Sequence, residues 1–188
     1  MNLCRLREGE IELLIGLSGF ARSGKDTVAG MLMGLHGFQN IAFANKLKEL
    51  LYKTNPLVWA GEGDTLYVQR IVDDIGWEAA KATPEVRELL QRIGVAARDI
   101  FGESFWIKQA LGDLDLSKKY VVTDVRFKNE AESILDLGGY VWRINRPGVG
   151  PANSHVSEND MTDWPFDAVI ENDKDMQHLI EQVGSLIK

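Results

Sequence analysis

The stretch "GFARSGKDT", from Gly19 to Thr27, has the residue types and the spacing of a phosphate-binding loop. The usual pattern is G-x-x-x-x-G-K-[ST], in which backbone N–H groups surround the phosphates, the lysine neutralises them and the hydroxyl binds magnesium. Asp26 stands where that hydroxyl residue is usual. Since a helix N-terminus also favours anions, the stretch predicts a site for a nucleoside triphosphate such as ATP. We expect the binding residues to be Gly19, Ala21, Arg22, Ser23, Gly24, Lys25, Asp26 and Thr27.

Asp26 needs a nearby cation if it lies beside bound phosphates. Two like unit charges about 4 Å apart repel by ~4 kcal/mol at an effective dielectric constant of about 20. One alternative is that Asp26 binds Mg²⁺, directly or through water. A second is that Asp26 pairs with Lys25 or an arginine, while Thr27 supplies the hydroxyl ligand. A third is that Asp26 only stabilises the positive end of the helix dipole.

The predicted elements around the loop follow the order that it requires. Ile11–Leu17 is a nearly continuous apolar run, typical of a strand buried on both faces of a parallel sheet, and the loop is followed by a helical repeat. Four more strands are expected at "FQNIAFA", "YVVTDV", "YVWRI" and "DAVIEN". Helices are expected at "NKLKELLYK", opened by Asn45, at "KNEAESILDLG" and at "KDMQHLIEQVGSLIK". This alternation predicts an α/β fold with a mainly parallel, five-stranded sheet covered by helices on both faces.

Two segments interrupt this alternation. Residues from about 54 to 115 are mostly helical in pattern, and Thr83-Pro84 is typical of an N-cap followed by proline in the first helical turn. Residues from about 145 to 164 are rich in Pro, Gly, Asn and Ser, and so long a loop between strands is often an active-site lid. We therefore expect one domain over residues 1–188, with a core of about 11–53, 116–144 and 165–188.

The composition limits the classes of function. The formal net charge is -7, which makes binding to polymeric nucleic acid a poor expectation, because phosphate neutralisation needs a basic face. The single cysteine excludes an internal disulfide framework, and no apolar run is long enough to span a bilayer. We expect a cytoplasmic protein that binds phosphate in a local pocket.

Asp124 and Arg126 follow the buried strand "YVVTDV". Ligands of an open α/β sheet bind beyond the carboxyl ends of its strands, so both side chains should face the same crevice as the phosphate loop. Asp124 is a candidate ligand of Mg²⁺ through water, and Arg126 a candidate clamp on a second phosphate. The alternatives are that Asp124 caps the next turn and that Arg126 forms a surface ion pair.

These stretches together resemble those of the P-loop nucleoside monophosphate kinases, and most closely the bacteriophage-type deoxynucleoside monophosphate kinases. The resemblance rests on "LSGFARSGKDT", which has the unusual Asp after Lys, and on "TDVRFKNEAE", "VRELLQRIG", "FWIK", "RINRPG" and "HVSE". It spans residues 17–158, which is most of the chain. The GKD of the loop also occurs in phosphomevalonate kinases, so the combination of all these stretches is more specific than the loop alone.

The resemblance implies a core, a helical insert for the acceptor nucleotide and a lid over the donor. Acceptor-site candidates are Arg70, Arg87, Gln91, Gly94, Trp106, Asp124, Arg126 and His155. Arg143 would contact ATP, and Arg146 would arrive with the lid. Among the catalytic candidates, Lys25 would hold the donor, Arg22 would bridge donor and acceptor phosphates, Arg126 would fix the acceptor and Arg146 would stabilise the transferred group. Asp26, Thr27 and Asp124 would hold Mg²⁺.

The predicted activity is transfer of a phosphoryl group from ATP to a deoxynucleoside monophosphate, with Mg²⁺ and a possible homodimer. One alternative is a P-loop kinase for another small phosphorylated acceptor, such as phosphomevalonate. The other is a nucleotide-binding switch module with slow ATPase activity. Arg126 stands where a switch commonly has an acidic residue that polarises water, which favours a kinase.

Overall fold

The computed structural model describes residues 13–61, 63–115, 117–151 and 160–187. The chain divides into two compact units, which are Met1–Ala42 with Asp113–Lys188, the sheet unit, and Phe43–Gly112, the helical unit. Among the described helices, none combines the length and the apolarity needed to cross a bilayer.

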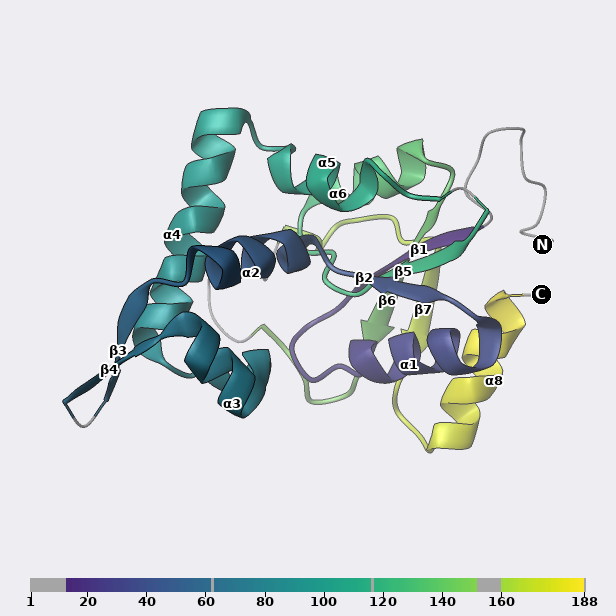
Figure 1. Cartoon of the computed structure of the whole chain (residues 1–188). Helices are drawn as coiled ribbons and strands as arrows, with labels where there is room; N and C mark the ends of the chain where they lie inside the picture. The colour runs from purple at the N-terminus through teal and green to yellow at the C-terminus, as the bar shows by residue number, and fades with distance from the viewer. Residues whose placement is uncertain (1–12, 62, 116, 152–159, 188) are drawn as a thin grey trace. The chain divides into compact units, whose positions relative to one another are not determined.

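The sheet unit contains a five-stranded sheet with the order β2-β5-β1-β6-β7, and every pair of neighbouring strands is parallel (Figure 1). The strands are β1 (Leu13–Ser18), β2 (Gln39–Ile41), β5 (Lys119–Val122), β6 (Tyr140–Asn145) and β7 (Ala168–Glu171). The helices among its described residues include α1 (Lys25–His36), α6 (Lys128–Asp136) and α8 (Met176–Leu186). Figure 1 shows α1 and α8 side by side on one face of the sheet and α6 on the other, so the expected α/β fold with a parallel sheet is confirmed.

Alternate residues of β1 pack against the two helical layers. Ile15 and Leu17 are fully buried in one apolar cluster with residues of α1 and α8, namely Val28, Ala29, Met31, Leu32, Leu179 and Val183. Gly16 faces α6, because a Cβ on Gly16 would lie only 2.6 Å from Cδ1 of Ile134. Since successive side chains of a strand point to opposite faces, the central strand is buried on both sides, as its apolar run predicted.

The helical unit contains four helices and a two-stranded hairpin among its described residues. The elements are α2 (Phe43–Thr54), β3 (Leu57–Gly61), β4 (Asp64–Tyr67), α3 (Val68–Ala80), α4 (Pro84–Phe101) and α5 (Phe105–Leu111). They enclose a separate apolar core made of Leu51, Val58, Val68, Ile71, Ala80 and Val86. Thr83 is the N-cap of α4 and Pro84 its first residue, which confirms the predicted start of that helix.

Two sequence predictions in this region were wrong. The strand expected over "FQNIAFA" ends at Ile41, and α2 begins at Phe43 rather than being opened by Asn45. Asn45 therefore lies inside α2 and does not cap it. The first helical residue is Phe43, which is only 4% exposed. Residues 54–115 are mostly helical, as expected, but they also contain the β3–β4 hairpin, in which the backbone N–H of Trp59 donates to the Glu85 carboxylate at 2.6 Å. Packing between distant residues therefore outweighed the local helical pattern.

Candidate active site

The phosphate loop lies between the end of β1 and the start of α1. Gly24 is the N-cap of α1 with a φ of 106°, a left-handed conformation that favours glycine. Gly19 has no room for a side chain, because a Cβ there would lie 2.6 Å from the Ile144 carbonyl oxygen and 2.7 Å from Ser23 Oγ. Both glycines of the motif are thus required by the backbone.

The Lys25 side chain lies within the loop. Its ammonium Nζ donates to the Gly19 carbonyl at 2.7 Å and to the Phe20 carbonyl at 2.9 Å. These contacts place a positive charge at the N-terminus of α1, where the helix dipole is also positive. The local field of this loop therefore attracts anions.

The loop residues fit a bound triphosphate. The first helical hydrogen bond runs from Val28 N–H to the Gly24 carbonyl at 3.0 Å, so the N–H groups of the first turn have no intrahelical acceptor. The Ser23 hydroxyl is buried and finds no hydrogen-bond partner among the described residues. A buried polar group without a partner calls for an explanation, and a phosphate oxygen is an acceptor that could satisfy both kinds of donor.

Asp26 and Thr27 are exposed on the first turn of α1. Within the described part of the chain Asp26 forms no ion pair, so the proposed pairing with Lys25 or an arginine has no support from its contacts. No group of three or more His, Cys, Asp or Glu side chains among the described residues is arranged to hold a metal ion. Magnesium commonly binds through one or two carboxylates, substrate phosphates and water, so Asp26 and Thr27 fit that mode rather than a metal cage made by protein alone.

A cleft adjoins the phosphate loop at the carboxyl edge of the sheet. It is open to solvent, and its lining residues are Ser18, Gly19, Phe20, Ala21, Val125, Arg126, Arg143 and Met161. The ends of β1, β5 and β6 therefore bring loop backbone and two arginines to one place. This agrees with the expectation that ligands bind beyond the carboxyl ends of parallel strands.

Arg143 is held rigidly in this cleft. Its guanidinium carbon lies 4.6 Å from the ring centroid of Phe20 and 5.5 Å from that of Phe166, and its Nε donates to Asn145 Oδ1 at 3.3 Å. Burial lowers the pKa of Arg143 from its ordinary value, and an arginine stays charged near neutral pH even so. The two rings leave the guanidinium charge available to the cleft while fixing its position.

Arg126 is exposed, and its backbone is fixed by the start of α6. The Glu130 carboxylate Oε2 accepts hydrogen bonds from the backbone N–H of Arg126 at 2.8 Å and from that of Phe127 at 3.1 Å. Asp124 is half-buried and has interactions of its own, but it is not among the residues that line the cleft. The structure thus places Arg126 in the cleft beside the phosphate loop.

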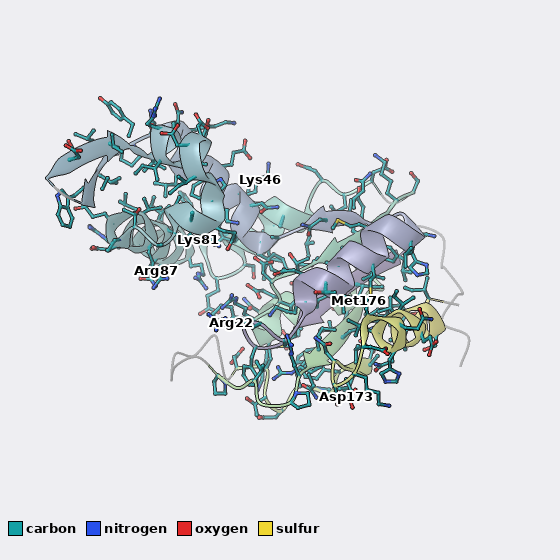
Figure 2. All side chains as sticks on the ribbon, turned by 90° about the horizontal axis from the view of Figure 1, so that it is seen from below. Arg22, Lys46, Lys81, Arg87, Asp173 and Met176 are labelled. Carbon is teal, nitrogen blue, oxygen red and sulfur yellow. The ribbon has the colours of Figure 1, made fainter. Side chains whose placement is uncertain are left out.

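Arg146 lies just after β6 and is exposed, in a turn closed by a hydrogen bond from Val149 N–H to the Arg146 carbonyl at 3.1 Å. Figure 2 labels Arg22, another exposed arginine, at the loop before α1. Arg22 has a φ of 67°, a left-handed backbone that is uncommon for residues other than glycine. His155 lies outside the described residues.

The predicted acceptor residues of the helical unit fall into two groups. Gly94 and Trp106 are buried, and the Trp106 indole N–H donates to the Gly94 carbonyl at 3.0 Å, which is a packing contact inside the unit. Arg87 and Gln91 are exposed one turn apart on α4, where they are free to reach a ligand. Arg70 is exposed too, but its Nε pairs with Asp74 Oδ2 at 2.7 Å on the same helix.

Sequence reasoning missed several residues of the site, among them Phe20, Phe166 and Asn172. The two rings hold Arg143, and Asn172 contacts the phosphate loop. Phe20 was within the loop motif but at a variable position, and Phe166 carried no signal. Asn172 follows the strand "DAVIEN", so the rule about carboxyl ends of strands could have found it.

A family model described as deoxynucleotide monophosphate kinase matches residues 69–183 of this chain. A protein of Acanthamoeba polyphaga mimivirus, to which the same activity is ascribed, is 30% identical in an alignment of 198 positions that covers 93% of this chain and 96% of that protein. The deoxynucleotide monophosphate kinase of Escherichia phage RB69 is 28% identical over 112 residues, and that of Enterobacteria phage T4 is 28% identical over 109 residues. These matches cover 56% and 55% of this chain but only 46% and 45% of the two phage proteins.

The solved structures that are similar to this chain include two small-molecule kinases. The dephospho-CoA kinase from Campylobacter jejuni is 14% identical with a TM-score of 0.43, over 93% of this chain and 94% of its own. The shikimate kinase from Aquifex aeolicus is 13% identical with a TM-score of 0.43, over 93% of this chain and 96% of its own.

Proposed function

Because the chain belongs to the deoxynucleotide monophosphate kinase family, we propose that it transfers the γ-phosphoryl group of ATP to the phosphate of a deoxynucleoside 5′-monophosphate. The observation that carries the proposal is the cleft that the phosphate loop shares with Arg126 and Arg143. Donor and acceptor phosphates must come within bonding distance although both are negatively charged. Arginines that line the same cleft as the phosphate loop provide the positioning and the charge compensation that this reaction needs.

On the donor side, the first-turn N–H groups of α1 and the Lys25 ammonium bind the phosphates of ATP. To bind ATP, the Lys25 ammonium must leave the Gly19 and Phe20 carbonyls and donate to phosphate oxygens instead. The flexible side chain of a lysine allows this change. Asp26 and Thr27 would hold Mg²⁺ there, directly or through water, and Asp124 is the third candidate ligand. When bound, the ion neutralises charge on the phosphates.

During transfer, the bond between the γ-phosphorus and its bridging oxygen to the β-phosphate breaks. A bond forms between the γ-phosphorus and an oxygen of the acceptor phosphate, which leaves ADP and a diphosphate product. Arg126 orients the acceptor phosphate, Arg143 binds the donor, and Arg22 and Arg146 stabilise the charge on the transferred group. The acceptor oxygen is already ionised at neutral pH, so no general base is required.

On the acceptor side, Arg87 and Gln91 of the helical unit are the foremost candidates for contact with the nucleotide, since both are exposed. Gly94 and Trp106 support that helix by their mutual hydrogen bond. Arg70, Asp124 and His155 complete the proposed set. A homodimer and a cytoplasmic location stay predictions from the sequence.

The test is a panel of ribo- and deoxynucleoside monophosphates, supplied one at a time with ATP and Mg²⁺, with the formation of ADP and of the diphosphate measured together. We expect diphosphate in amounts equal to ADP for at least one deoxynucleoside monophosphate. Rapid ADP release that needs no acceptor would contradict the proposal and favour the switch module. Transfer to phosphomevalonate alone would favour the other kinase.

A further inference from the structure

The side chain of Asn172 connects the end of β7 to the phosphate loop, although 149 residues separate it from Ser23 in the sequence. Its amide nitrogen Nδ2 donates to the Ser23 carbonyl at 2.9 Å. The same amide lies against Gly24, so closely that a Cβ on Gly24 would collide with Asn172 Nδ2. Asn172 therefore contacts the two residues that join the loop to α1.

Asn172 is itself fixed from two neighbouring elements. Its backbone N–H donates to the Asn145 carbonyl at the end of β6, at 2.7 Å. The residue before it, Glu171, exchanges two hydrogen bonds with the Gln182 side chain of α8, one at 3.0 Å and one at 2.9 Å. Because the backbone around Asn172 is anchored in this way, the Asn172 side chain can hold the loop in one position.

The contact has a directional consequence for the loop. No peptide bond in the described chain is cis, and in a trans peptide the C=O and the next N–H point in opposite directions. Since the Ser23 carbonyl points to Asn172, the Gly24 N–H must point away from it. Gly24 precedes Lys25 at the positive end of α1, so its N–H belongs to the group of donors that surrounds an anion at this helix N-terminus.

We infer that Asn172 is a positioning residue for the donor site: its amide holds the Ser23–Gly24 peptide in the orientation that directs the Gly24 N–H toward the phosphates of ATP. The inference rests on the proposed function for the identity of the ligand. In this proposal Asn172 acts through the loop backbone and makes no contact with the reacting atoms. Its effect should therefore be on the affinity for the donor and not on that for the acceptor.

The decisive variant is Asn172→Asp in the full chain. A carboxylate has nearly the shape of the amide but cannot donate, and it repels the Ser23 carbonyl. Leaving a partly buried carbonyl without its donor typically weakens a state enough to change an equilibrium by about tenfold. We expect the Kd of ADP, measured by calorimetry without turnover, to rise about tenfold or more. The KM for ATP should rise likewise, while the KM for the monophosphate stays within about twofold.

Gln177→Glu is the matched control, because it makes the same change from amide to carboxylate at an exposed position of α8, where the Gln177 amide donates to Glu181. It should leave the Kd of ADP unchanged. A purely structural effect of Asn172→Asp would lower the active fraction and hence kcat, but would leave both KM values alone, and that result would overturn the inference. A Kd of ADP within twofold of wild type in a folded variant would overturn it as well.

If Asn172→Asp does not fold, as judged by thermal unfolding, Asn172→Ser decides in the same way, since it removes the amide without adding charge. Failure of both variants to fold would mean that Asn172 serves the fold, and would contradict the inference.

The ADP measurement needs no acceptor. A wild-type chain that binds ADP but phosphorylates no deoxynucleoside monophosphate would therefore refute the proposed function. The role of Asn172 could still be tested by comparing the Kd of ADP of the variant with that of the wild type. A wild-type chain that does not bind ADP would refute both.

Discussion

At the level of single residues, the charge of the site comes from Lys25 in the phosphate loop and from Arg126 and Arg143 in the adjoining cleft. Each is placed by a different means. Lys25 contacts the loop carbonyls, the backbone of Arg126 is fixed by Glu130, and Arg143 packs between two phenylalanine rings. Fixed cations stabilise a transition state better than mobile ones, because they need no reorganisation when the charge moves.

Substituting Lys25 by alanine should lower the rate of phosphoryl transfer by about a hundredfold or more, because the variant loses the ammonium that binds the donor phosphates in the proposed mechanism. The fold should survive, since Lys25 is only half-buried and begins a helix that is anchored by its apolar face. A coupled assay of ADP release and a thermal unfolding curve give the two measurements. Lys174→Ala, at an exposed lysine between β7 and α8, is the control and should keep the full rate.

Substituting Arg126 by alanine should raise the KM for the monophosphate and lower kcat, while the Kd of ADP stays close to that of the wild type. The reason is that Arg126 binds the acceptor phosphate in the proposed assignment. Steady-state kinetics in both substrates and ADP calorimetry separate these effects. If only the affinity for ADP fell, the assignment of donor and acceptor arginines would have to be reversed.

At the level of elements, the position of the loop depends on close packing between β1, α6 and β6. Gly139 lies in the turn between α6 and β6, where an added Cβ would lie 2.7 Å from the Leu14 carbonyl oxygen and 2.9 Å from that of Ile134. Both atoms belong to the backbone, so neither can move aside as a side chain would. This turn aligns β6, which carries Arg143, against the central strand.

Gly139→Ala should therefore destabilise the chain by about 2 kcal/mol through overpacking against backbone atoms. Gly34→Ala provides a control of opposite sign, because Gly34 lies within α1 with no atom near the position of its Cβ. That change should stabilise the chain by about 0.5–1 kcal/mol, since alanine favours a helix. Urea unfolding of the three proteins tests both signs. Equal stabilities would show that the α6–β6 turn tolerates a side chain.

At the level of the whole molecule, the acidic character agrees with a protein whose phosphate ligands are small. The net charge of -7 opposes association with a polyanion, although the phosphate loop and the arginines of the cleft attract individual phosphate groups. Long-range repulsion acts on a polymer as a whole, whereas a mononucleotide responds mainly to the local field of the cleft.

The full chain should consequently show no binding to a random DNA duplex at physiological salt, that is, a Kd weaker than about 100 μM. Fluorescence anisotropy of a labelled duplex measures this, and displacement of a fluorescent ATP analogue by ATP in the same buffer shows that the protein is active in binding. Duplex affinity in the micromolar range that falls steeply with salt would contradict the prediction.

Much of the fold and part of the site could be predicted from the sequence, because both depend on local patterns. The apolar run at β1, the glycine spacing of the loop and the charged residues that follow β5 are all contiguous, and each has a direct physical meaning. The β3–β4 hairpin and the early start of α2 could not be predicted, since they arise from burial of Val58 and Phe43 among distant residues.

The sequence by itself thus determined the parallel α/β sheet, the phosphate loop with Lys25, and the family to which the chain belongs. Only the tertiary structure decided which side chains meet at the site. Arg143 packs against the rings of Phe20 and Phe166. Trp106 donates to the Gly94 carbonyl, and Asn172 donates to the phosphate loop. The physical reason is one of range. Periodicity and motif spacing encode interactions between residues near in sequence, whereas the contacts that orient a site join segments that meet only after the sheet has formed.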